Sequence, residues 1–210
     1  MTVQDGAPFP GNYAWTKGGA ILMQGSYAGS SSQFLALTRD VLFSGNMTGG
    51  TFTRHSDGSF SVENGIANAI HMGGDQNVQL AASEGRQIRF NDPVTSSALS
   101  SSRENIAFSI NQYMDGDNPR TTGGTVIFSG ELYQGEDSHL VASRYNDFKG
   151  QTTLYGGTLV LEHNVVFGNS DLREDTSMTL ENGTLEITGG STVNAAPFTV
   201  SPADLVLRPG

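Results

Sequence analysis

Residues 153–161 read TLYGGTLVL, and residues 179–187 read TLENGTLEI. The two stretches keep Thr, Leu, Gly, Thr, Leu and a final aliphatic residue in register, 26 residues apart (153 to 179). A related element, GGTVIF at 123–128, lies 33 residues before GGTLVL at 156–161 (123 to 156). Internal repeats of about 20 to 50 residues with short strands are typical of solenoids, because each repeat covers the open face of its neighbour.

Further strands are expected wherever short β-branched or aromatic runs lie between turn residues. The expected strands are 34–37, 40–43, 59–63, 77–81, 87–90, 125–129, 158–161 and 184–188. Between Ser100 and Met114, apolar residues recur at every second position from Ile106 to Ile110. This spacing favours a loop followed by a strand over a helix. Turns every few residues also favour stacked coils over the hairpin-joined strands of a sandwich.

The predicted fold is an all-β, right-handed, single-stranded parallel β-helix. Successive coils are expected to stack about 4.8 Å apart, with equivalent side chains in columns. The expected inward residues are Leu159, Leu161, Leu185 and Ile187. Val160 and Glu186 are expected to face outward, because successive residues of a strand point to opposite faces. Residues 1–210 are expected to form a single domain of roughly eight or nine coils, with irregular loops around 95–120 and 132–150.

Composition narrows the classes of partner. The net charge is −10 and the sequence pI is about 4.6, which argues against nucleic acid and anionic lipid, since both are bound through Lys and Arg. The chain has no cysteine, which excludes disulfides and thiolate metal sites. It has no run of about 18 apolar residues, and its start lacks the basic and apolar regions of a signal peptide. We interpret the chain as a fragment of a longer exported protein.

A second set of motifs is spread through the chain. GGAI at 18–21 is followed by FSGN at 43–46, by a segment from 68 to 94 that ends in FNDPV, and by GGTVIFSGE at 123–131. In this order the motifs resemble those of the polymorphic outer-membrane proteins of chlamydiae and of related adhesin-type autotransporter passengers. Structural roles in tight corners and polar ladders are expected for the motif residues. These are Gly18, Gly19, Ala20, Ile21, Phe43, Asn46, Asp92 and Pro93.

The resemblance implies a function at the surface of a Gram-negative bacterium. The chain is then expected to be a passenger fragment that acts as an adhesin or display scaffold, anchored in the outer membrane through a C-terminal β-barrel outside this fragment. A host-surface glycan or a matrix protein is the implied partner, and no cofactor is implied. Two alternatives stay open: self-association of passengers, and a polysaccharide-acting enzyme of the tailspike or lyase type.

The sequence lacks patterns for catalysis or metal binding. Its four histidines form no HExxH pair, and none lies in a GxSxG elbow. Asp115 to Asn118 begin like a calcium loop, but Val126 stands where that loop has Glu, so we expect a solvated turn. Glu162 and Glu186 flank strands without an evident partner, whereas a glycosidase needs two carboxylates about 5 to 9 Å apart. We predict no enzyme activity, no metal and no cofactor.

Aromatic residues in and around the irregular stretch form the candidate binding surface. They are Tyr113, Tyr133, Tyr145 and Phe148. Exposed aromatic rings supply large contact areas for a partner. The competing interpretation is that these rings pack beneath loops or cap the ends of the core.

Overall fold

A computed structural model describes residues 1–6, 8–15, 17–24, 31–73, 76–96, 106–129, 140–141, 145–146, 150–168, 176–195, 197–200 and 204–207. All regular elements within these residues are β-strands. No helix long and apolar enough to cross a membrane is therefore found in this part of the chain. Parallel pairing dominates the larger sheets, which confirms the predicted all-β class with parallel strands.

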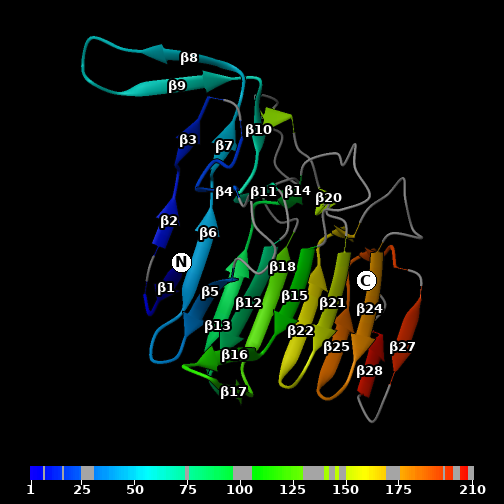
Figure 1. Ribbon diagram of the computed structural model, residues 1–210. Helices are drawn as coiled ribbons and strands as arrows, with labels where there is room; N and C mark the ends of the chain where they lie inside the picture. Colours follow the sequence, from blue (N-terminus) through cyan, green and yellow to red (C-terminus); the bar gives the residue numbers. More distant parts are fainter. Residues whose placement is uncertain are drawn as a thin grey trace.

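The chain alternates between two long sheets, which we call sheet 1 and sheet 2 (Figure 1). Sheet 1 has the order β1 (Thr2–Gln4), β5 (Ser31–Ala36), β12 (Gln76–Ala82), β15 (Ile106–Ile110), β21 (Gly150–Leu154), β24 (Thr176–Leu180) and β27 (Phe198–Val200). Sheet 2 has the order β2 (Pro8–Pro10), β6 (Val41–Ser44), β13 (Gln87–Phe90), β18 (Thr125–Ser129), β22 (Thr158–Glu162), β25 (Thr184–Ile187) and β28 (Asp204–Leu207). Neighbouring strands in both sheets are parallel. Each repeat therefore adds one strand to each long sheet.

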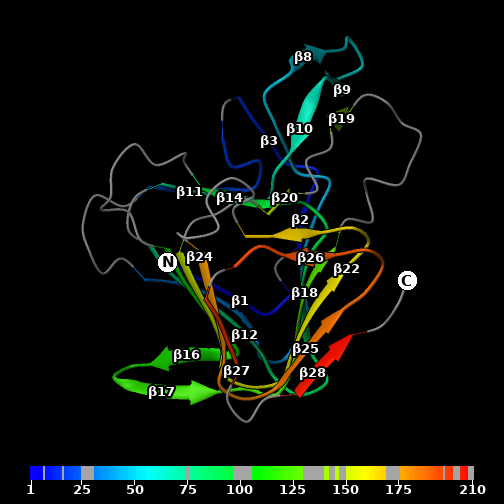
Figure 2. The same ribbon diagram turned by 90° about the vertical axis from the view of Figure 1, so that its right-hand side faces the viewer.

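Short strands form a further side of the stack. One sheet has the order β19 (Leu140–Val141), β10 (Gly65–Ala67), β7 (Met47–Thr48) and β3 (Tyr13–Ala14). A second sheet has the order β14 (Val94–Ser96), β11 (Ile70–Gly73) and β4 (Ile21–Gln24). A third has the order β20 (Tyr145–Asn146), β23 (Val166–Phe167) and β26 (Thr192–Val193). Figure 2 shows the two long sheets converging toward one edge, with β11, β14 and β20 across the opposite side.

The predicted register of the repeats is confirmed. Leu159 pairs with Leu185 on adjacent parallel strands, and both side chains are 0% exposed. The neighbouring positions Val160 and Glu186 pair in the same register and stay partly exposed, as expected for outward residues. Ile187 is only partly buried and packs against the core. The 26-residue period therefore places equivalent side chains directly above one another.

Phenylalanine rings form a continuous column inside sheet 2. The rings of Phe9, Phe43, Phe90 and Phe128 stack with centroids 4.6, 4.7 and 5.0 Å apart, and Phe167 meets Phe128 edge-on at 4.9 Å. Parallel pairing brings these inward positions of successive strands together. Such ring pairs contribute about 0.5–1.5 kcal/mol each beyond the burial of apolar area.

Two expectations about the winding were wrong. Each long sheet has seven strands in the described residues, where roughly eight or nine coils were expected. Two antiparallel hairpins interrupt the winding: β8 (Thr51–Arg54) with β9 (Phe60–Glu63), which includes a strand expected to belong to a coil, and β16 (Gln112–Asp115) with β17 (Asn118–Thr121), most of which lies where an irregular loop was expected. The strand expected at 59–63 is thus half of a hairpin. Strands β7 and β10 also pair in opposite directions.

The structure describes one of the two regions that were expected to be irregular loops, and only a small part of the other. Within 95–120 the structure places strand β15 and the hairpin β16–β17. Most of 132–150 lies outside the described residues.

Candidate functional surface

The GGAI and FSGN motifs meet at one corner of the stack. A Cβ atom on Gly19 would lie 2.4 Å from the carbonyl oxygen of Asn68 and 2.6 Å from the nitrogen of Met47. Gly18 has a φ of +67°, and its N–H donates a 3.1 Å hydrogen bond to Oδ1 of Asn68. A side chain at Gly19 would collide with backbone, and one at Gly18 would be strained. The glycine pair therefore allows two distant segments to touch.

The other motif residues also contact the chain itself. Ala20 and Ile21 both donate their N–H groups to the carbonyl oxygen of Ala69 and pack against the core. Pro93 is buried, and its carbonyl oxygen accepts a 2.8 Å hydrogen bond from the N–H of Ala69. Phe43 lies within the ring column.

Amide and carboxyl groups continue the corner between repeats, and two of them, Asn46 and Asp92, are buried. Nδ2 of Asn12 donates to Oδ1 of Asn46 at 2.8 Å, and Nδ2 of Asn46 donates to Oδ2 of Asp92 at 2.6 Å. The N–H groups of Gly45 and Asn46 donate to the same carboxylate at 2.9 Å. Asp92 is 1% exposed. Burial raises the pKa of Asp92, although the N–H donors around the carboxylate act in the opposite direction.

The structure describes one side chain of the predicted aromatic surface. Tyr113 lies on β16 and is partly buried. Tyr145 belongs to β20, but its side chain lies outside the described part. Tyr133 and Phe148 also lie outside the described residues. Only the side chain of Tyr113 can therefore be placed, and the four-residue aromatic surface stays a prediction.

The hairpin β16–β17 is attached to the outer face of sheet 1. Nε2 of Gln33 donates to the carbonyl oxygen of Met114 at 2.8 Å, and the N–H of Met114 donates to Oε1 of Gln79 at 2.9 Å. Gly116 in the turn has a φ of +60°. Pro119, which pairs with Met114, has no N–H to offer to a further strand. The β16 edge of this hairpin is thus occupied by Gln33 and Gln79, and Pro119 interrupts the hydrogen-bonding groups of the β17 edge.

The suspected calcium loop is the exposed turn of this hairpin. Asp115 forms an exposed ion pair with Arg120, with Oδ2 and Nε 3.5 Å apart. Across the described residues, no group of three His, Asp or Glu side chains could hold a metal ion.

The hairpin β8–β9 projects from the stack near the N-terminal end (Figure 1). At its base, the rings of Phe52 and Tyr13 stack at 5.3 Å, and Phe52 pairs with Val62 across the hairpin. At its tip, Oδ1 of Asp57 accepts hydrogen bonds from the N–H and the hydroxyl of Ser59 at 2.9 and 2.6 Å. Sequence reasoning missed this hairpin. The Asp-Gly step between two strand-like runs, TFTR and FSVE, was the available signal.

Three exposed apolar side chains lie around the base of this hairpin: Trp15, Phe52 and Ile66, with 72%, 39% and 43% exposed. We call them the hairpin surface. Ile66 pairs with Thr48, which in turn pairs with Ala14, the residue before Trp15. Exposed aromatic and aliphatic groups next to a projecting element are typical of contact sites.

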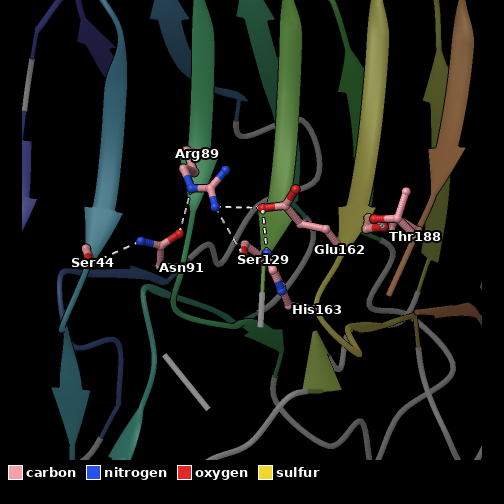
Figure 3. A network of polar contacts seen from close by, with 8 residues as sticks. Ser44, Arg89, Asn91, Ser129, Glu162, His163 and Thr188 are labelled. Atoms are coloured by element: carbon pink, nitrogen blue, oxygen red, sulfur yellow. Dashed lines mark hydrogen bonds and ion pairs between the residues drawn. The ribbon is translucent and has the colours of Figure 1, made fainter. Parts of the chain in front are cut away.

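A polar network crosses the outer face of sheet 2 (Figure 3). Arg89 on β13 reaches over β18 to Glu162 on β22, with Nη2 and Oε1 2.6 Å apart. Arg89 also donates to Oγ of Ser129 at 3.3 Å and to Oδ1 of Asn91 at 2.9 Å. Nε2 of His163 lies 3.6 Å from the same carboxylate oxygen of Glu162. The network therefore ties three strands together through Arg89 and Glu162.

Stacked parallel sheets, corner motifs and projecting hairpins define a repetitive all-β protein. The chain is similar to three proteins of Chlamydia pneumoniae. It is 30% identical to probable outer membrane protein pmp8 over 198 residues, 29% to pmp13 over 209 and 32% to pmp2 over 177, covering 94%, 93% and 82% of this chain. The chain is thus homologous over most of its length to chlamydial polymorphic outer-membrane proteins. This confirms the predicted resemblance and the predicted location at the outer-membrane surface of a Gram-negative bacterium.

The chain spans 19%, 20% and 19% of the lengths of pmp8, pmp13 and pmp2, respectively. No protein-family model matches the chain. No solved structure matches it either.

Proposed function

We propose that the chain is a segment of a right-handed, single-stranded parallel β-helix in the passenger of an autotransporter, and that it acts as an adhesin. The observation that carries this proposal is the ordered hairpin β8–β9, which projects from rigid stacked sheets with exposed apolar groups at its base. The stacked core supplies rigidity, because its ring column and paired leucines run through successive repeats. A rigid support lowers the entropy lost when a projecting element binds.

The proposed contact site is the hairpin surface. Trp15 is the most exposed of its side chains, and Phe52 is held in place by its stack on Tyr13. A ring that is already ordered loses little conformational freedom on binding and removes a large apolar area from water. The proposed partner is a host-surface glycan or a matrix protein. Because the chain has a net charge of −10, it would repel a strongly negative partner, so a neutral or positively charged partner is favoured.

The test measures binding of the 210-residue chain to an immobilised glycan array and a matrix-protein array. Trp15→Ala is expected to weaken saturable binding by roughly tenfold or more, as the loss of a buried anchor does. Phe52→Ala is expected to weaken it as well. Phe198→Ala is the matched control, because Phe198 is also 39% exposed but lies on the last strand of sheet 1. Equal effects of Phe52→Ala and Phe198→Ala, or saturable binding indifferent to Trp15, would contradict the proposed surface.

Self-association is a second candidate, supported by the outer face of sheet 1. One column of paired positions there contains no charged side chain. It consists of Thr2, Gln33, Gln79, Ser109, Thr153, Thr179 and Thr199. Hairpin β16–β17 covers this column at Gln33 and Gln79, so the part open to a second copy lies at Ser109, Thr179 and Thr199. Two copies of a chain with a net charge of −10 repel one another least through such a face. Sedimentation should then reveal a mass that rises with concentration, reduced by Thr179→Asp but not by the control Thr184→Asp on sheet 2.

We further propose that the segment is not an enzyme. Among the described carboxylates, Asp92 is enclosed by N–H donors and Glu162 is bound to Arg89. A polysaccharide-cleaving site needs a pair of carboxylates that can reach the sugar. Incubation with surface polysaccharides should therefore release no new reducing or unsaturated ends, and their appearance would favour the tailspike-like alternative.

A further inference from the structure

The sequence contains two Asn-Gly steps, and the structure treats them differently. Asn182 is exposed in the bend between β24 and β25, and the N–H of Gly183 lies 3.0 Å from Oδ1 of Asn182. Because Oδ1 is bonded to Cγ, this contact holds the Gly183 nitrogen beside the carbon that it would attack. We propose that Asn182–Gly183 is a site of spontaneous deamidation and isoaspartate formation in the folded protein.

The chemistry needs only water and a base. The Gly183 nitrogen loses its proton and forms a bond to Cγ of Asn182, the bond from Cγ to Nδ2 breaks, and ammonia leaves with the proton. Water then opens the resulting cyclic imide at one of its two carbonyl carbons, which yields either aspartate or isoaspartate. No atom is oxidised or reduced. The step is intramolecular, so its rate depends on how closely the nitrogen and Cγ are held together.

The packing around Asn182–Gly183 favours attack of the Gly183 nitrogen on Cγ of Asn182. The neighbouring N–H groups of Glu181 and Asn182 both donate to the carbonyl oxygen of Leu154, and that of Thr184 donates to Gly157. Gly183 instead directs its N–H to the side chain of the residue before it. The exposed Asn182 side chain leaves water free access to the leaving amide.

The other Asn-Gly dipeptide, Asn64–Gly65, is shielded from this reaction. Gly65 is buried and begins β10, which pairs with β7 and β19. Gly50 packs directly on the connecting peptide: a Cβ atom there would lie 2.7 Å from the nitrogen of Gly65 and 2.9 Å from the carbonyl carbon of Asn64. A strand in a ladder resists the backbone rotation that ring closure requires. The folded protein is therefore expected to modify Asn182 and to spare Asn64.

The modification would alter a tight corner of the repeat. A Cβ atom on Gly183 would lie 2.5 Å from the carbonyl oxygen of Gly157, so the corner has little free space. Isoaspartate inserts one methylene group into the main chain at this corner. It also places a new carboxylate next to Glu181. Both changes are expected to weaken the pairing of β25 with β22 at its first residues.

The test incubates the folded 210-residue chain at mildly alkaline pH, with a parallel sample unfolded in urea. Peptide mapping by mass spectrometry follows both Asn-Gly steps, and an isoaspartate-specific methyl-transfer assay quantifies the product. In the folded sample Asn182 should convert roughly tenfold or more faster than Asn64. In urea the two rates should become similar, because both steps then lie in flexible chain.

A variant separates the chemistry from general damage. Asn182→Gln keeps a primary amide but would need a larger ring, so it should abolish the signal at this corner in a protein with unchanged circular dichroism. Gly183→Ala is unsuitable, because Gly183 has a φ of +107° and the added Cβ would meet backbone. The proposal is overturned if Asn182 remains intact in the folded chain while it reacts in urea, or if Asn64 reacts as fast as Asn182 in the folded chain.

Discussion

Truncating Phe43 tests whether the core is one continuous column. Its ring is 0% exposed, stacks on Phe9 at 4.6 Å and on Phe90 at 4.7 Å, and meets Phe34 edge-on at 5.8 Å. Phe43→Leu keeps most of the apolar volume but removes the ring contacts, and two stacked pairs at about 0.5–1.5 kcal/mol each predict a loss of about 1–3 kcal/mol. Phe43→Ala adds a cavity, so the total loss should reach about 3–5 kcal/mol.

Urea unfolding followed by circular dichroism measures these losses. Phe198→Ala serves as the control, because its ring is 39% exposed and its removal leaves no closed cavity. Repeat proteins can unfold one segment at a time, so the early transition is the one to compare. A Phe43→Ala midpoint no lower than that of Phe198→Ala would refute the stacked-column reasoning, whatever the behaviour of Phe43→Leu.

Three further predictions concern buried or partly buried polar groups. Asp92→Asn turns an amide NH2 toward N–H donors and should cost about 1–3 kcal/mol in unfolding free energy, whereas Asp117→Asn in an exposed turn should stay within about 0.5 kcal/mol of the wild type. A double-mutant cycle of Arg89→Met and Glu162→Gln should return a coupling energy of about 1 kcal/mol, and a value of zero would mean that the ion pair does not tie the strands. Desolvation, with a smaller contribution from a nearby lysine, lowers the pKa of His71 below its usual 6.5, so the unfolded chain binds more protons and stability should fall as pH drops below about 6.5. Urea midpoints measured across this range should depend less on pH in His71→Gln, and an unchanged slope would exclude His71 as the cause.

The local pattern of the chain was enough to predict how the strands stack. Thr, Leu and Gly recur 26 residues apart, so Leu159 and Leu185 occupy equivalent positions of adjacent strands. Alternation along a strand then decides which side chains face the core. The candidate surface was less predictable. The aromatic residues chosen from the irregular stretch lie mostly outside the described residues, whereas the hairpin surface includes Phe52, whose ring stacks on Tyr13 from a distant part of the chain.

What the sequence determined by itself is the all-β class, the repeat register and the inward faces, because each depends on spacing within about one repeat. Only the tertiary structure decided which distant groups meet. Arg89 and Glu162 are 73 residues apart, and Asn46 and Asp92 are 46 apart. Their contact depends on the lengths of the insertions between repeats, since each hairpin shifts the chain by a number of residues that no local pattern encodes. Side-chain partners across coils are therefore fixed by the winding as a whole.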